Sequence, residues 1–302
     1  MLDYIVIGLA FILVALVAGN NLSITAGNII GGRITSKKLG ISIAIIGYVV
    51  GFLAEHDFMR HGIFNILPSA TSMILIYMFV VAIVIFLISH KLRIPQSLSM
   101  TFTFIIIGVA LATNVAINYF YIMEVIIFWV VSPLIILYLT KVIVNFSKKK
   151  VENAPIWRTI NTLKYLAIFA TFFTAFTLGA NTIGLAYSVL PSNMLTIFVF
   201  IVAIIVGSAL LSGNELKTIS SIIPIRYLNS VITETISMVA VEVATLFGVP
   251  LSNTQTYTFA LYGAGAGYKN KAIVKRPLVK LIYGWVSMAL VGLIATLILV
   301  AI

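Results

Sequence analysis

The sequence predicts an all-α integral membrane protein built from two inverted repeats of about five crossings each, with broken or re-entrant helices at the midplane. Apolar residues make up 61% of the 302 residues and charged residues only 9%, with a mean hydropathy of +1.16. Soluble domains average about 45–50% apolar and about 25% charged residues. Three sequence landmarks also recur in the same order in both halves, which indicates an internal duplication.

We expect ten crossings, because apolar runs along the chain approach the roughly 20 residues that span a hydrocarbon core. Of the 19 Lys and Arg residues, all but Arg60 fall in connections that alternate to one side. The positive-inside rule places those connections in the cytoplasm and both termini outside the cell membrane. This distribution accounts for the net charge of +11 without a nucleic-acid partner. The predicted crossings are 3–31, 39–54, 71–89, 94–119, 122–144, 165–189, 192–211, 226–248, 250–268 and 279–301.

Five crossings per half is an odd number, so the second half enters the membrane from the opposite side. The predicted divisions are a first repeat over 1–143, a basic cytoplasmic linker over 144–164, and a second, inverted repeat over 165–302. Inverted repeats of this kind exchange inward-facing and outward-facing states in many transporters. The sequence therefore favours a carrier.

The first landmark is an asparagine inside an apolar stretch, at Asn20 in V-A-G-N-N and at Asn181 in L-G-A-N-T. Polar and glycine-rich breaks surround these residues, over 19–35 and 177–184. Irregular backbone at membrane depth is tolerated only where it is buried in protein or lines a wet cavity. The alternative is that the small residues serve close helix packing.

The second landmark is a proline followed by hydroxyl residues, in I-P-Q-S-L-S at 94–99 and V-P-L-S-N-T at 249–254. Proline at the first helical position with serine nearby is a favourable helix start. Free backbone N–H groups at such a start can bind an anion. Two starts that face each other would form a neutral cage for a tetrahedral oxyanion. Alternatively, Pro95 and Pro250 each mark only the end of a loop.

The third landmark is F-W-V-V-S at 128–132, echoed by G-W-V-S at 284–287. An enzyme is not expected, since no H-E-x-x-H, paired-aspartate or Ser/His constellation is present. With no cysteine and three scattered histidines, we expect neither a metal centre nor a cofactor. An anion channel is a further alternative, although a channel would not require two inverted copies.

These landmarks resemble the paired signatures of the inorganic phosphate transporter (PiT) family, G-A-N-D-V-A-N-A and P-V-S-T-T-H, over almost the whole chain. Glu234 also matches the family, at the position of a glutamate before the second proline motif. The resemblance implies an ion-coupled importer of phosphate, with sulfate as the runner-up substrate. It also implies that the anion ligands are Ser97, Ser99, Ser252, Asn253 and Thr254. Asn20 and Asn181 would support the centre of this site.

The departures from the family pattern bear on the coupling ion. Asn21 and Thr182 replace the family aspartates, which removes negative charge from the expected cation site. Histidines of the family are replaced as well, by Met100 and Gln255. Protons therefore become an alternative to sodium, and an acid within a crossing is a functional candidate by default. We expect Glu234 to serve this role ahead of Glu242. A homodimer is retained as an alternative to a monomer.

Overall fold

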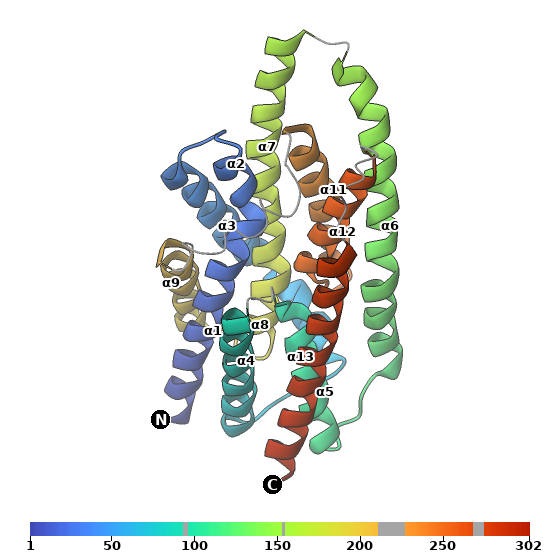
Figure 1. The fold of residues 1–302 in the computed structure, drawn as a ribbon. Coiled ribbons are helices and arrows are strands. Elements are labelled where there is room, and N and C mark those ends of the chain that lie inside the picture. The colour runs from blue at the N-terminus through green and yellow to red at the C-terminus, as the bar shows by residue number, and fades with distance from the viewer. Residues whose placement is uncertain (93–95, 153–154, 211–226, 268–274) are drawn as a thin grey trace.

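The computed structural model of the chain describes residues 1–92, 96–152, 155–210, 227–267 and 275–302, and every regular element within these ranges is a helix. The helices form an elongated bundle with both termini at one end (Figure 1). The first half contains α1 (Leu2–Thr25), α2 (Gly27–Gly31), α3 (Lys37–Phe64), α4 (Ser72–Leu92), α5 (Leu98–Ala112) and α6 (Tyr119–Glu152).

The second half starts with α7, which passes through a single π-helical segment, η1, into the short helix α8. The segment predicted as a linker, 144–164, is mostly helical, because α6 continues to Glu152 and α7 begins at Ile156. The elements are α7 (Ile156–Leu178), η1 (Gly179–Ile183), α8 (Gly184–Ser188), α9 (Met194–Leu210), α11 (Tyr227–Leu246), α12 (Asn253–Gly267) and α13 (Lys275–Ala301).

Within the described residues, six stretches are long and apolar enough to cross a bilayer, which confirms an all-α membrane protein with several crossings. Many large apolar side chains on these helices are exposed at the surface of the bundle, as expected where lipid is the solvent. The six spans are Leu2–Leu22, Lys37–Phe64, Ser72–Ser89, Tyr119–Lys148, Thr159–Ser188 and Leu278–Ala301.

Several predicted boundaries are wrong. Helix α3 continues to Phe64, beyond the predicted end of the second crossing at residue 54. Helices α5 and α12 have only 15 residues each, so they are too short for the full crossings predicted over 94–119 and 250–268. Pro250 lies before α12 rather than in its first turn, because the helix begins only after Ser252. Pro95 and the predicted connections over 211–226 and 268–274 lie outside the described residues.

The short helices belong to two hairpins that enter the bundle from opposite ends. Figure 1 shows α4 and α5 in the half of the bundle that holds the termini, and α11 and α12 in the other half. The tips of the two hairpins meet near the middle, where Thr254 Oγ1 donates a hydrogen bond to the carbonyl of Gln96 at 3.5 Å. The fold thus positions two helix starts at the centre of the molecule.

The main helix contacts come in equivalent pairs, in which each helix is replaced by its counterpart from the other half of the chain. Helix α1 packs against α9 as α7 packs against α3, and α5 packs against α13 as α12 packs against α6. The hairpins follow the same rule, because α4 contacts α1 and α13 while α11 contacts α7 and α6. Each half therefore buries its apolar faces against the other, and neither forms a separate bundle.

Matching glycines allow the closest of these approaches. A methyl group added at Gly51 would lie 2.0 Å from the carbonyl oxygen of Phe176, and one at Gly207 would lie 2.1 Å from that of Ala15. Such distances exclude any side chain, so backbones of α3 and α7, and of α9 and α1, are in direct contact. Small residues serve the same purpose in many membrane proteins, where helices associate through close packing.

Both predicted asparagine breaks are real, although the first lies later than Asn20. Helix α1 continues through Asn20 and Asn21 to Thr25, and the chain then turns through α2 to Arg33, which has a positive φ of 54°. The second break is the π-helical segment η1, which contains Asn181. Single π turns inside α-helices occur frequently at functional sites.

Candidate functional site

Each proline–serine segment contains a serine, Ser97 or Ser252, that caps the start of a helix. Ser97 is the N-cap of α5, and its Oγ accepts a hydrogen bond from the Met100 N–H at 3.3 Å. Ser252 Oγ accepts the equivalent bond from the Gln255 N–H at 3.3 Å. Serine favours this position because its hydroxyl satisfies one of the free N–H groups of the first turn. The two segments therefore form the same local structure.

The starts of α5 and α12 lie against each other at the hairpin tips. Besides the bond between Thr254 and Gln96, Gln255 Nε2 contacts Met100 Sδ at 3.0 Å. Each helix start carries about half a positive charge from the aligned peptide dipoles. Two such starts in contact favour a negative charge between them, which fits the predicted binding of an anion.

All of the residues predicted as direct anion ligands are buried, and Ser252 has no exposed surface. The site is thus closed to solvent in this structure. The donors that it offers are hydroxyl, amide and backbone N–H groups, so an anion held here would be bound by neutral groups. The buried set consists of Ser97, Ser99, Ser252, Asn253 and Thr254.

Further polar atoms near these helix starts are buried without a hydrogen-bond partner in the described part of the chain. They include Gln96 Oε1, Asn253 Nδ2 and Gln255 Oε1. Each unpaired buried polar group costs about 1–3 kcal/mol. Three of them within two short segments indicate a polar site rather than a packed core. Gln96 was not predicted, although a glutamine between Pro95 and Ser97 is an unusual choice for a buried membrane segment.

Asn181 connects the π-helical segment to the tip of the second hairpin. Its Nδ2 donates to Thr245 Oγ1 and to the carbonyl of Val249, both at 3.0 Å, while its Oδ1 is buried and unpaired. Asn20, the matching residue of the first half, is half-buried on α1. Asn21 and Thr182, which replace the family aspartates, are both buried. Of these residues, Asn181 is hydrogen-bonded to the loop that leads into α12.

Glu234 on α11 is completely buried and is hydrogen-bonded to residues from two other helices. Asn28 Nδ2 on α2 donates to Glu234 Oε1 at 2.5 Å, and Thr171 Oγ1 on α7 donates to Glu234 Oε2 at 3.2 Å. Asn28 Nδ2 also contacts the hydroxyl of Tyr257 on α12 at 2.6 Å. Sequence reasoning identified Glu234 but missed its three neighbours. Only Asn28 carried a signal, as a polar residue in the first break.

One turn along α11 from Glu234, a buried serine contacts the start of α12. Ser237, one turn after Glu234, donates from Oγ to Asn253 Oδ1 at 3.3 Å and lies 2.7 Å from Thr256 Oγ1. All four side chains are buried. The acid and the candidate anion site therefore lie on neighbouring turns of the same two packed helices, α11 and α12.

Glu242, the second acid on α11, lies next to Glu55, which falls in a predicted connection after the crossing 39–54. Because α3 continues to Phe64, Glu55 lies within this helix, and its side chain forms a hydrogen-bonding contact with that of Glu242. Both residues are only partly buried, in contrast to Glu234. Glu55 is therefore a third acid within a membrane-spanning helix, beyond the end of the crossing predicted over 39–54.

Fold and site together define a polytopic helical membrane protein with two opposed hairpins and a buried, neutral polar site between their tips. Comparisons with known proteins agree with this class. The model of the phosphate transporter family matches residues 144–296, which is just over half of the chain. A protein of Methanocaldococcus jannaschii, "Putative phosphate permease MJ0630", is 21% identical over 286 residues, which cover 95% of this chain and 93% of that protein.

A solved structure described as "The sodium-dependent phosphate transporter" has the same fold, with a TM-score of 0.79. The superposition covers 99% of this chain and 98% of the other, at 15% sequence identity. The chain belongs to the phosphate transporter family. The predicted resemblance is thereby confirmed, and the members of this family are transporters rather than enzymes.

Proposed function

We propose that this protein is an ion-coupled secondary transporter that imports inorganic phosphate across the cell membrane by alternating access. The observation that carries this proposal is the contact between the capped starts of α5 and α12, made by Thr254 with Gln96 and by Gln255 with Met100. Family membership and the names of its relatives favour phosphate over sulfate.

Phosphate would bind between the two helix starts, held by backbone N–H groups and by the hydroxyls of Ser97, Ser99, Ser252 and Thr254, with Asn253 as an amide donor. Neutral donors at helix starts can hold an anion tightly without a buried arginine. They also allow release, because no opposite full charge has to be separated from the substrate. Asn181 would support the tip of the second hairpin through its bond to Val249.

Coupling would use either a proton or a sodium ion. Glu234 is the proposed proton carrier, because it is a fully buried acid one helical turn before Ser237, which is hydrogen-bonded to Asn253 at the start of α12. Sodium is supported by the printed name of the structural neighbour, and Asn21 and Thr182 are the proposed neutral ligands for it. Sodium binds hard oxygen ligands, which amide and hydroxyl groups supply without formal charge.

The exchange symmetry of the helix contacts supports the proposed mechanism of alternating access. Two hairpins that enter from opposite ends, with equivalent partners, can swap conformations so that the central site opens first to one side and then to the other. On the positive-inside rule the end that holds both termini faces the outside. Whether two copies associate as a dimer does not affect this mechanism within one chain.

Uptake into proteoliposomes tests the proposal directly. Labelled phosphate should accumulate above its external concentration in the presence of an inward sodium or proton gradient, and uptake should saturate. Unlabelled phosphate and arsenate should compete more strongly than sulfate and molybdate. Stronger inhibition by sulfate would make the protein a sulfate permease, and an uncoupled, non-saturating flux would make it an anion channel.

A further inference from the structure

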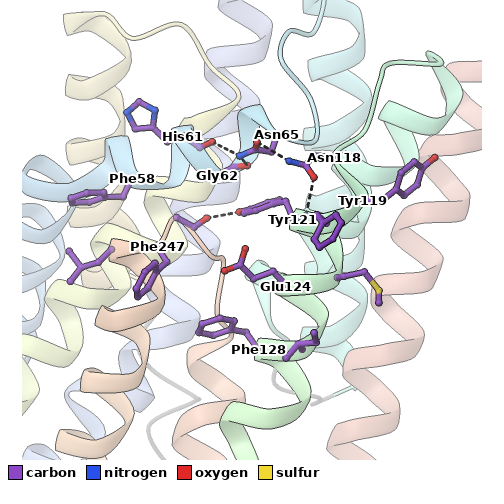
Figure 2. Close-up of a pocket in the computed structure, with 15 residues that line it drawn as sticks. Phe58, His61, Gly62, Asn65, Asn118, Tyr119, Tyr121, Glu124, Phe128 and Phe247 are labelled. Carbon is purple, nitrogen blue, oxygen red and sulfur yellow. Dashed lines mark hydrogen bonds between the residues drawn. The ribbon is translucent and has the colours of Figure 1, made fainter.

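A cavity of about 980 Å³ lies at the end of the bundle that holds the termini, between the end of α3, the start of α6 and the loop after α11 (Figure 2). Its wall includes Asn65, Asn118, Tyr121, Glu124 and Gly248. Asn118 donates its backbone N–H to the carbonyl of Asn65 at 3.0 Å, which joins the two connections at the rim. The cavity is thus bounded on one side by the same loop that leads into the candidate anion site.

The loop after α11, residues 247–252, accepts side-chain hydrogen bonds at three successive backbone carbonyls. Tyr121 Oη donates to the carbonyl of Gly248 at 2.5 Å, Asn181 Nδ2 to that of Val249 at 3.0 Å, and Trp129 Nε1 to that of Pro250 at 2.7 Å. Three side-chain bonds on consecutive carbonyls hold the loop in one position. Two of the three donors come from α6, which belongs to the other half of the chain.

The loop is also in direct backbone contact with α3. A methyl group added at Gly62 would lie 1.9 Å from the carbonyl oxygen of Gly248 and 2.4 Å from the hydroxyl of Tyr121. Gly248 itself has a positive φ of 68°, a conformation that glycine adopts at little cost. Gly62, Tyr121 and Gly248 therefore form a tight three-way contact in the wall of the cavity.

Beyond this contact the chain reaches the anion site within a few residues. Gly248 precedes Ser252 by four positions, which is at most about 14 Å of extended chain. The intervening Val249 and Leu251 are completely buried, as is Ser252. The residues between the cavity wall at Gly248 and the start of α12 are therefore closed to solvent in this structure.

We propose that this cavity is the vestibule through which the anion reaches the central site from the side of the termini, and that the Tyr121–Gly248 hydrogen bond is the latch that closes it. The inference rests on the proposed transport function. Tyr121 would act as a positioning residue, since it binds the loop and not the substrate. Its hydroxyl is the element of the latch that can be removed without changing the shape of the side chain.

Thiol labelling tests the latch without any measurement of transport. The natural chain contains no cysteine, so Leu251→Cys creates one reporter site beside Ser252. Its rate of reaction with a membrane-impermeant thiol reagent, added on the side of the termini, measures how often the loop opens. In a Tyr121→Phe background this rate should rise by about two- to tenfold, which is the effect of losing one neutral hydrogen bond.

Tyr119→Phe is the matched control, because Tyr119 also lines the cavity but its side chain is exposed. This change should leave the labelling rate unaltered. Trp129→Phe, which removes the bond to Pro250, should also accelerate labelling and provides a second test if Tyr121→Phe does not fold. Equal rates in the parent, Tyr121→Phe and Trp129→Phe proteins would overturn the latch. Because labelling needs no substrate, this result would be distinct from a failure of phosphate uptake.

Discussion

Gln255 and Met100 contact each other at the centre of the molecule, with Gln255 Nε2 3.0 Å from Met100 Sδ. These are the two positions at which the phosphate transporter signatures carry histidine. The substitutions are therefore neighbours in space, one in the first turn of α5 and one in the first turn of α12. At the candidate anion site, a pair of ionisable groups in the family signatures is therefore replaced by a pair that cannot change charge.

This replacement predicts how substrate affinity depends on pH. Met100 and Gln255 should add no pH dependence to the KM for phosphate, so any dependence in the parent protein comes from the anion itself or from the coupling acid. Gln255→His should introduce a dependence, with tighter binding at low pH, because a protonated imidazole adds positive charge next to the helix starts. Uptake measured from pH 5.5 to pH 8 would test this. Gln255→Asn, which also cannot titrate, is the control.

Removal of the capping hydroxyls should weaken phosphate binding. Ser97→Ala and Ser252→Ala each delete one donor at a helix start, so KM should rise several-fold, in line with about 0.5–1.5 kcal/mol for a neutral hydrogen bond. Ser252→Asp should be far worse, because it places a negative charge against the anion. Thermal unfolding should be measured in parallel, since the loss of an N-cap alone costs about 1 kcal/mol of stability.

Ser287→Ala provides the comparison for this series, because the Ser287 hydroxyl donates a local hydrogen bond within α13, to the carbonyl of Gly284 at 3.2 Å. Its KM should match that of the parent. Normal transport by the Ser252→Asp variant would show that the proline–serine segments serve packing, and the anion site would then have to lie elsewhere.

Membrane orientation is the third prediction. Cysteine introduced at Asp57, an exposed residue near the end of α3, should react with an impermeant reagent in intact cells. Cysteine at Lys149, near the end of α6, should be shielded until the membrane is permeabilised. The reason is the concentration of Lys and Arg residues at the end of the bundle that contains the α6–α7 connection. The reverse pattern would invert the direction assigned to transport.

The sequence was informative where function depends on local chemistry that occurs twice. The serine caps at Ser97 and Ser252 could be predicted because N-capping involves only a few consecutive residues and because the two segments supported each other. The break at Asn181 could be predicted for the same reason. Helix ends were less predictable, since α3 continues through Glu55 to Phe64 across residues whose polarity suggested a loop.

Residues whose roles arise only from tertiary contacts could not be predicted. Asn28, Thr171 and Tyr257 are neutral residues on three different helices, and nothing in their local sequence connects them to Glu234. Tyr121 likewise sits 127 positions before the carbonyl that it binds. Such pairings are set by the packing of one half against the other, which hydropathy and spacing do not encode.

The last prediction concerns coupling. Glu234→Gln retains the shape of the side chain but cannot bind or release a proton, so it should abolish concentrative uptake while leaving phosphate exchange and binding measurable. Asn28 can still donate to the amide oxygen of the variant, and the Thr171 hydroxyl can accept from its amide nitrogen, which limits structural damage. Glu242→Gln should be milder, because Glu242 is only partly buried and contacts Glu55, whereas Glu234 lies one turn from the serine that contacts the start of α12.

Uptake driven separately by a sodium gradient and by a pH gradient distinguishes the outcomes. If Glu242→Gln is the more damaging change, the proton role belongs to the Glu55–Glu242 pair on α3 and α11. Strict sodium dependence without a pH effect would instead assign coupling to a cation site of neutral oxygens, with Asn20, Asn21, Asn181 and Thr182 as its ligands. In that case Glu234→Gln should still transport, and Asn181→Ala should raise the sodium concentration required for half-maximal uptake, because Asn181 Oδ1 is a buried oxygen without a hydrogen-bond partner among the residues that the structure describes.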